Sequence, residues 1–114
     1  SWVNIKTGDE FDIEDYPFGT SANLISGIAK PERFLNSVSN LGISCEHKFF
    51  PDHHYFSESD IKFDFKRAIL MTEKDAVRLD KMLIQKNMWF LKMKVKLNVN
   101  ITKLITDKLN EQRL

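Results

Sequence analysis

The apolar run at 68–71, Ala-Ile-Leu-Met, is followed without a break by Thr-Glu-Lys-Asp at 72–75. A strand buried on both faces loses the usual alternation of apolar and polar residues, so the run predicts a central strand of a parallel sheet. Thr72 can cap a following helix, with Asp75 three residues later as its capping partner. Parallel strands need crossover connections, so this run predicts a chain of alternating strands and helices.

The rest of the sequence continues this alternation. The predicted order is strand 22–26, helix 31–41 with Pro31 at its first position, strand 43–50, a short helix opened by a capping box at 57–60, strand 68–71, helix 73–87, strand 89–97 and helix 101–109. Ile61 and Phe65 are expected to be buried beside the short helix. The fold class predicted is therefore α/β, a mainly parallel sheet with flanking helices joined by right-handed crossovers.

Two of these segments carry detailed expectations. The helix after 72 takes its apolar face from Ala76, Val77, Leu79, Met82 and Leu83 and ends at Asn87. In the strand 89–97, apolar residues from Trp89 to Leu97, Met93 among them, alternate with Phe90 and three lysines, Lys92, Lys94 and Lys96. Lysines discourage pairing with other chains, so an edge strand in water is favoured over a lipid-binding face.

The start of the chain predicts a β-hairpin. Residues 2–5 and 11–13 are β-like and flank a Gly-Asp turn, and an acidic connector follows to Gly19. We expect residues 1–20 to form a hairpin linker and residues 21–114 an α/β domain. The chain has 114 residues, 42% hydrophobic and 29% charged, which is typical of one globular domain. Its net charge of +1 gives no reason to expect nucleic-acid binding.

The chemistry of this sequence is concentrated in Phe50-Pro51-Asp52-His53-His54-Tyr55-Phe56. Histidine is suited to moving protons near neutral pH, and an adjacent carboxylate can hold its ring in one tautomer. Pro51 ends the preceding strand, which places the histidines on the loop at its carboxyl end, where ligands bind in open α/β sheets. An ordinary surface loop is the alternative. Asp52 could orient His53 or only cap a turn, and His54 could be a plain exposed side chain.

Several classes of site and segment are not expected. The single cysteine, Cys45, can form no internal disulfide, and no cysteine spacing suits a metal. Adjacent His53 and His54 would point apart, so we predict no metal site. The sequence contains no apolar run that could span a membrane and no signal peptide. Its first residue is Ser1, which suggests a piece of a longer chain.

Three stretches at these spacings resemble one family. They are Ser26-Gly27-Ile28-Ala29-Lys30-Pro31-Glu32-Arg33-Phe34, Phe50-Pro51-Asp52-His53-His54 and Leu70-Met71-Thr72-Glu73-Lys74-Asp75-Ala76-Val77. Together they resemble the C-terminal part of the tetraacyldisaccharide 4'-kinases, the lipid A 4'-kinases of Gram-negative bacteria. The family usually has Gly-Ile-Gly-Asn-Pro in the first stretch, where this chain has Ala29 and Lys30.

The resemblance implies a kinase that transfers the γ-phosphoryl group of ATP to the 4'-hydroxyl of a lipid A disaccharide precursor. It implies a P-loop and Mg²⁺-binding carboxylates in an N-terminal domain, absent here, to which residues 1–20 would be the link. By motif position, His53 would work with an aspartate of that domain to deprotonate the sugar hydroxyl, with Asp52 beside it. The full-length enzyme would act at the cytoplasmic face of the inner membrane, and this chain alone would be inactive.

The third stretch is the candidate nucleotide contact. Lys74 could reach a nucleotide or a phosphate, or it could be an ordinary solvated lysine. Thr72 could contact the nucleotide beside it, although helix capping alone explains both Thr72 and Asp75. Arg33 is expected to be structural. The rival function is a stand-alone α/β domain that binds an anionic ligand or a partner protein and catalyses nothing.

Overall fold

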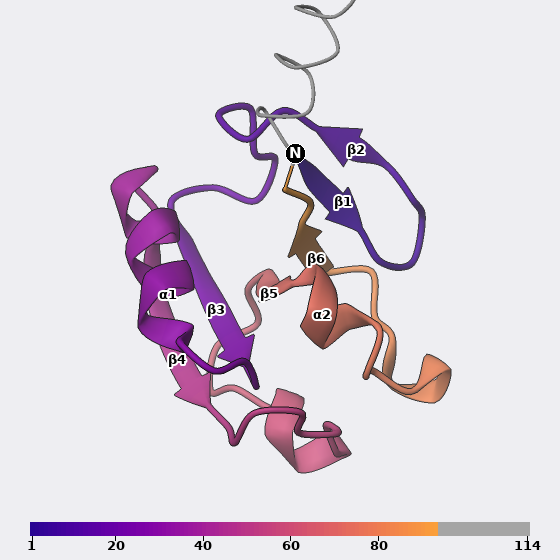
Figure 1. Cartoon of the computed structure of the whole chain (residues 1–114). Helices are drawn as coiled ribbons and strands as arrows, with labels where there is room; N and C mark the ends of the chain where they lie inside the picture. The colour runs from indigo at the N-terminus through magenta and orange to yellow at the C-terminus, as the bar shows by residue number, and fades with distance from the viewer. Residues whose placement is uncertain (94–114) are drawn as a thin grey trace, which may run out of the picture.

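The computed structural model describes residues 1–93, which form one six-stranded sheet with helical segments on both faces (Figure 1). The strands are β1 (Trp2–Asn4), β2 (Glu10–Phe11), β3 (Ser21–Ser26), β4 (Ser44–Phe49), β5 (Ile69–Thr72) and β6 (Met88–Leu91). Their order across the sheet is β2-β1-β6-β5-β3-β4. Strands β6, β5, β3 and β4 are mutually parallel, which confirms the predicted α/β class.

The predicted hairpin is present, and it extends the main sheet. β1 pairs antiparallel with β2, placing Trp2 opposite Phe11, and antiparallel with β6, placing Trp2 opposite Leu91. Gly8 turns the hairpin with a φ of +78°, a conformation that glycine adopts without a Cβ penalty. The indigo β1 and the orange-brown β6 therefore lie side by side in Figure 1, although they are the first and last strands described.

The sheet buries a separate apolar cluster on each face, because alternate residues of a strand point to opposite sides. Helix α1 (Pro31–Asn40) covers one face, where its Phe34 and Val38 pack with Leu24 and Leu70. The 3₁₀ turn η1 (Glu58–Ile61) and the chain after β5 cover the other, where the cluster is Ile25, Phe56, Ile61, Ile69, Met71, Leu79 and Met88. Both faces of β3 and β5 are thus covered, as the continuous apolar run at 68–71 predicted for β5.

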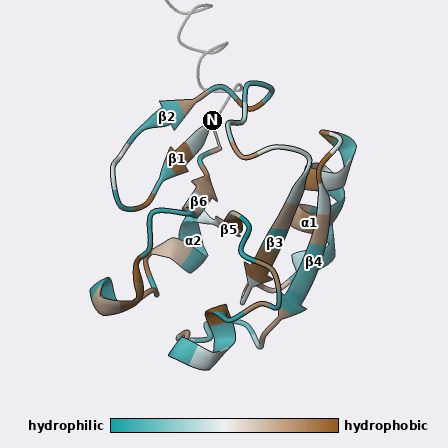
Figure 2. Cartoon of the chain, turned by 180° about the vertical axis from the view of Figure 1, so that it is seen from behind, coloured by the Kyte–Doolittle hydropathy of each residue, from teal (hydrophilic) through white to brown (hydrophobic). Residues whose placement is uncertain are grey.

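β4 is the exposed edge of the parallel part of the sheet. It pairs with β3 alone among residues 1–93, and its outward positions are polar or only half-buried. Figure 2 shows this contrast as the teal of β4 beside the browner β3. Gly42, with a φ of +90°, ends α1 and turns the chain into β4, so the predicted cap is confirmed.

The predicted helix 73–87 is wrong in extent. α2 (Glu73–Ala76) is a single turn, and a 3₁₀ turn, η2 (Lys81–Leu83), follows it. Asp80 is extended, and its side chain accepts the backbone N–H of Met82 at 3.1 Å, which starts a separate turn in place of a continued helix. Val77 and Met82 are 80% and 91% exposed, so the apolar spacing from 76 to 83 does not form one buried helix face.

The prediction for the strand from 89 is also wrong in position. β6 lies inside the sheet, between β1 and β5, and not at an edge. Both of its faces are therefore covered: Leu91 packs with one apolar cluster, and Met88 and Phe90 pack with the other. Met93, expected to be buried, is 73% exposed. Lys92 follows the strand and is exposed, whereas Lys94, Lys96 and the helix predicted at 101–109 lie outside the described residues.

The short helix after the histidine loop matches its prediction in part. Ser57 and Asp60 form the expected capping box, and Ile61 is buried. Phe65, however, is 60% exposed and lies against the guanidinium of Arg67, with 4.9 Å between the ring centroid and Cζ. Within residues 1–93, no helix combines the length and the apolar character that crossing a bilayer demands.

Candidate active site at the carboxyl edge of the sheet

The parallel strands bring three of the singled-out stretches to one edge of the sheet. The backbone N–H of Phe50, just after β4, donates to the carbonyl of Ser26 at 2.8 Å. The N–H of His53 donates to the carbonyl of Gly27 at 3.0 Å. The end of β5 reaches the same point through Asp75, so the histidine loop lies at the same edge as Thr72, as the sequence predicted.

Asp75 is a fully buried carboxylate that joins two of these strand ends. Its Oδ1 accepts the backbone N–H of Gly27 at 2.8 Å. Its Oδ2 accepts the hydroxyl of Thr72 at 2.8 Å and the N–H of Thr72 at 3.3 Å. The capping role was predictable from local spacing, whereas the bond to Gly27 spans 48 residues and has no local sequence pattern. Asp75 therefore caps α2 and also positions the turn after β3.

Gly27 is required by the close approach of the histidine loop. A Cβ at this position would lie 3.1 Å from the Cβ of His54 and 3.2 Å from the carbonyl oxygen of Pro51. These contacts are tighter than ordinary van der Waals separations, so any larger residue must push the loop away. Glycine at 27 therefore lets the backbone after β3 support the loop directly.

His53 combines a strained backbone with an exposed ring. Its φ is +64°, the only positive value at a non-glycine residue among residues 1–93, and its side chain is 79% exposed. Arg78 donates from Nη2 to the ring Nδ1 at 3.1 Å and from Nη1 to the carbonyl of Gly27 at 2.8 Å. The ring Nε2 lies 3.6 Å from Oδ2 of Asp52, a carboxylate that is itself 45% exposed. Arg78 was not among the predicted site residues, because it reaches His53 across 25 residues of sequence.

His54 points away from His53 into a packed setting, as the two adjacent residues were expected to do. Its Nε2 is 2.8 Å from Oδ2 of Asp60, and its ring stacks on Phe50 with centroids 4.7 Å apart. Burial alone would raise the pKa of Asp60, but hydrogen bonds from Ser57 and His54 outweigh it and hold that pKa below its usual value. The interpretation of His54 as a plain exposed side chain is wrong, because its side chain is only 29% exposed. Its bond to Asp60 and its stacking on Phe50 hold the loop together.

Thr72 and Lys74 line an open cavity of about 580 Å³ at this edge. Its other lining residues are Ile28, Ala29, Lys30, Arg33, Phe34, Glu73, Leu91 and Met93. Within residues 1–93, the cations of Lys30, Arg33 and Lys74 take part in no ion pair. Apolar walls with unpaired cations suit a ligand that has both an apolar part and phosphate groups. Arg33, expected to be structural, is thus a further candidate contact.

Nucleophilic and metal chemistry find little support in the described residues. Burial raises the pKa of the Cys45 thiol to about 11, so very little reactive thiolate exists near neutral pH. Over residues 1–93, no three or more His, Cys, Asp or Glu side chains come together as metal ligands could. Asp75 is buried and fully engaged with Gly27 and Thr72. Asp75 is therefore not available as a metal ligand.

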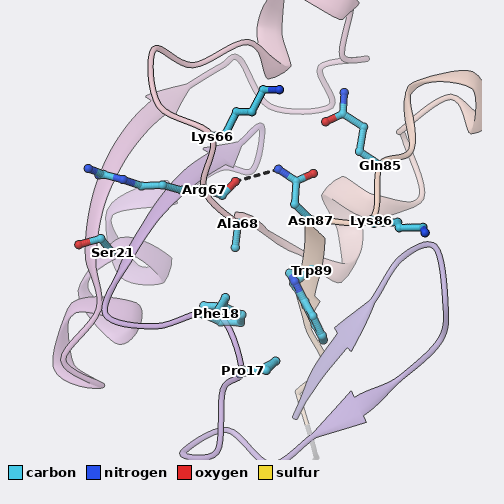
Figure 3. Close-up of a pocket in the computed structure, with 10 residues that line it drawn as sticks. All are labelled: Pro17, Phe18, Ser21, Lys66, Arg67, Ala68, Gln85, Lys86, Asn87 and Trp89. Carbon is cyan, nitrogen blue, oxygen red and sulfur yellow. Dashed lines mark hydrogen bonds between the residues drawn. The ribbon is translucent and has the colours of Figure 1, made fainter.

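A second cavity, of about 690 Å³, lies at the amino edge of the sheet, where the parallel strands β3, β5 and β6 begin. No predicted site residue lines it. Figure 3 shows Lys66, Gln85 and Lys86 along one side and Phe18 and Trp89 on another. The dashed line marks the side-chain amide of Asn87 donating to the carbonyl of Arg67 at 2.8 Å. This contact holds together two loops that lead into β5 and β6.

Comparison with known proteins identifies one family. The model of the family described as tetraacyldisaccharide-1-P 4'-kinase matches residues 4–110. A tetraacyldisaccharide 4'-kinase from Ruthia magnifica is 37% identical over 108 residues, which cover 95% of this chain and 34% of the relative. Another, from Hahella chejuensis, is 33% identical over 112 residues, covering 98% and 32% respectively. The chain thus spans about a third of the length of these curated relatives.

A solved structure shows the same fold. It is described as the "apo" form of LpxK from Aquifex aeolicus in complex with ATP. The match has a TM-score of 0.58 and 23% sequence identity, and it covers 93% of this chain and 32% of that one. At this identity the likeness establishes the α/β fold and leaves the roles of individual residues to the local geometry.

Proposed function

The chain belongs to the tetraacyldisaccharide-1-P 4'-kinase family, and we propose that it is the C-terminal α/β domain of an ATP-dependent kinase. The substrate would be a tetraacyldisaccharide 1-phosphate lipid A precursor, phosphorylated on its 4'-hydroxyl. The observation that carries this proposal is the convergence of His53, Gly27, Thr72 and Asp75 at the carboxyl edge of the sheet. Phosphoryl transfer depends on such positioning more than on covalent chemistry by the protein.

His53 is the candidate catalytic residue. Its backbone is anchored on Gly27, and its side chain is 79% exposed, so that a substrate could approach the ring. We infer that His53 and an aspartate of the N-terminal domain act as a pair in which the aspartate carboxylate takes the proton of the sugar hydroxyl and His53 supports that carboxylate. The sugar oxygen then bonds to the γ-phosphorus of ATP as the bond from that phosphorus to the bridging oxygen breaks and ADP leaves. Asp52, whose Oδ2 lies 3.6 Å from Nε2, is beyond good hydrogen-bond distance, so it would act on the ring through its nearby charge.

Lys74 and Thr72 are the candidate nucleotide contacts. Lys74 is exposed at a cavity whose apolar walls could receive part of a nucleotide and whose cations could hold its phosphates. The Thr72 hydroxyl already donates to Asp75, so its contribution would be to fix the turn that presents Lys74. ATP supplies the γ-phosphoryl group. Mg²⁺ ligands are expected from the N-terminal domain, as the family resemblance implies.

The remaining partners follow from this assignment. The hairpin at residues 1–20 would connect to an N-terminal P-loop domain of the same chain, which completes the site. The full-length enzyme would work on the cytoplasmic face of the bacterial inner membrane, where its lipid substrate is found. The 114-residue chain alone, assayed with ATP, Mg²⁺ and the disaccharide precursor, is expected to give no turnover above buffer background. Measurable turnover would refute the two-domain arrangement.

The decisive experiment compares two neighbouring histidines in the full-length kinase. His53→Ala should lower kcat by roughly a hundred- to ten-thousand-fold, the usual range for losing general-base help, with much smaller changes in KM. His54→Ala is the matched control, because it removes an imidazole one residue away that bonds to Asp60. Equal losses in the two variants, or a near-normal kcat for His53→Ala, would refute the catalytic assignment. Unchanged far-UV circular dichroism guards against loss of fold.

The rival function is a stand-alone domain that binds an anionic ligand and catalyses nothing. The cations around the cavity of Lys74, which form no ion pair within residues 1–93, are the one observation in its favour. Tight binding of ATP by the 114-residue chain, combined with kinase activity that is unchanged by His53→Ala in the full-length protein, would favour this alternative.

A further inference from the structure

We propose that Arg78 is a positioning residue that holds the ring of His53 in its Nε2–H tautomer. The ring state is independent of any reaction, whereas the catalytic consequence rests on the function proposed above. Arg78 lies outside the three stretches that carry the family resemblance, and it reaches His53 across 25 residues of sequence.

The chemistry of the guanidinium fixes the proton on the ring. Arginine has five N–H donors, no acceptor, and no neutral form in proteins. Its Nη2 lies 3.1 Å from Nδ1 of His53, so Nδ1 must present a lone pair. A neutral imidazole with a lone pair on Nδ1 carries its proton on Nε2. Protonation of both nitrogens would set two N–H donors against each other at this contact.

The contact is part of a closed set of hydrogen bonds. Nη1 of Arg78 donates to the carbonyl of Gly27, the same oxygen that accepts the backbone N–H of His53. The N–H of Arg78 in turn donates to the carbonyl of Asp75 at 3.0 Å, and the Asp75 carboxylate holds the N–H of Gly27. Arg78 is therefore placed by the buried core of the site, although it acts on an exposed ring.

This arrangement sets what His53 can offer to an incoming group. Because Nδ1 is occupied by Arg78, the other ring nitrogen, Nε2, is a hydrogen-bond donor that favours an acceptor such as a carboxylate. Nε2 is 3.6 Å from Asp52, too far for a good hydrogen bond, so its N–H remains available. The positive φ of His53 costs strain, and the bonds to Gly27 and Arg78 are the contacts that offset it.

The test is nitrogen NMR of the 114-residue chain labelled with ¹⁵N-histidine, at a pH where all three imidazoles are neutral. The chain has only His47, His53 and His54, so each ring can be assigned by substitution. In the wild type, His53 should be almost wholly in the Nε2–H form. Exposed His47 supplies the unconstrained reference mixture, and His54, bonded to Asp60, should be insensitive to Arg78.

Arg78→Ala should move the His53 ring shifts to the mixture of His47 and leave those of His54 unchanged. Arg78→Lys keeps one cationic donor without the fork and should restore part of the effect. Arg67→Ala, an arginine at the opposite edge, is the matched control and should change neither ring. If His53 in the wild-type chain already shows the same mixture of tautomers as His47, the proposal is overturned. This measurement does not depend on whether any variant folds. A His53 tautomer unchanged in folded Arg78→Ala also overturns it.

Kinetics of the full-length kinase separate this proposal from the proposed function. Arg78→Ala should lower kcat by about tenfold, the size of one lost hydrogen bond to a charged group, with little change in KM and partial recovery in Arg78→Lys. If the tautomer depends on Arg78 but His53→Ala leaves kcat intact, the function fails and the positioning role stands. If His53 is essential but its tautomer ignores Arg78, the positioning role fails alone.

Discussion

The two edges of the sheet look alike in composition but differ in how their polar groups are held. Each has an open cavity with three basic side chains: Lys30, Arg33 and Lys74 at the carboxyl edge, and Lys66, Arg67 and Lys86 at the amino edge. At the carboxyl edge, a buried carboxylate, a close glycine contact and a strained histidine join three strand ends. At the amino edge, side-chain amides bond to backbone carbonyls and join neighbouring loops.

This difference shows that cavity size and positive charge alone do not indicate the site. The amino-edge cavity is the larger, yet no ionisable acid lines it and its hydrogen bonds are those of loop closure. The carboxyl edge accepts burial of the Asp75 charge and an unfavourable φ at His53. Costs of this kind tend to persist where function depends on the geometry.

The largest expected effect is loss of the buried carboxylate. Asp75→Ala should lower the free energy of unfolding by about 3 kcal/mol, because the buried N–H of Gly27 and the partly buried hydroxyl and N–H of Thr72 lose their acceptor. Asn87→Ala removes the corresponding amino-edge bond and should cost only about 1 kcal/mol. Urea denaturation of both variants measures the difference. Equal losses would show that the two edges are held equally well.

The second effect separates the two groups of cations. In the full-length kinase, Lys74→Ala should raise KM for ATP about tenfold, the value of one lost charge-assisted phosphate contact, with kcat little changed. Lys86→Ala removes a lysine from the amino-edge cavity and should leave both constants within about twofold. A larger effect from Lys86 would move the nucleotide to the opposite edge.

The smallest effect concerns acid. Because the pKa of Asp60 is held below its ordinary value, its stabilising contribution is present above the ordinary pKa and is lost as pH falls through the lowered one. Lowering the pH from about 5 to 3 should therefore weaken amide exchange protection at 54–60 before it does at 66–68. His54→Ala removes one of the hydrogen bonds that lower this pKa, so the loop should loosen at a higher pH. Simultaneous loss at both edges would contradict this.

The fold was largely predictable because its strongest patterns are local. The apolar run at 68–71, the proline that starts α1 and the glycine that ends it each act on neighbouring residues. The errors have one cause, since tertiary contacts overrode local periodicity. Asp80 starts a new turn where the spacing suggested continued helix, and β1 pairs with β6 where alternation suggested an edge.

The candidate site was predictable only in part. Motif positions brought His53, Asp52, Thr72 and Lys74 to one edge, because the ends of parallel strands meet there. The hydrogen-bond partners of the two histidine rings were not predicted. Arg78 bonds to the ring of His53, and Asp60 bonds to the ring of His54. No local spacing links Arg78 to the loop, so only the folded chain reveals this contact.

The pairing of β1 with β6 has a consequence for the order in which the molecule assembles. Trp2 is fully buried, yet its partner Leu91 is made about 90 residues later in synthesis. At the usual rates of synthesis, β1 waits several seconds before the strand that completes its pairing exists. The tryptophan is exposed for that time, and the longest-range closure in the sheet is left to the end. A chain truncated before residue 88 would therefore contain the strands β3, β4 and β5 with a hairpin that has no β6 to pair with.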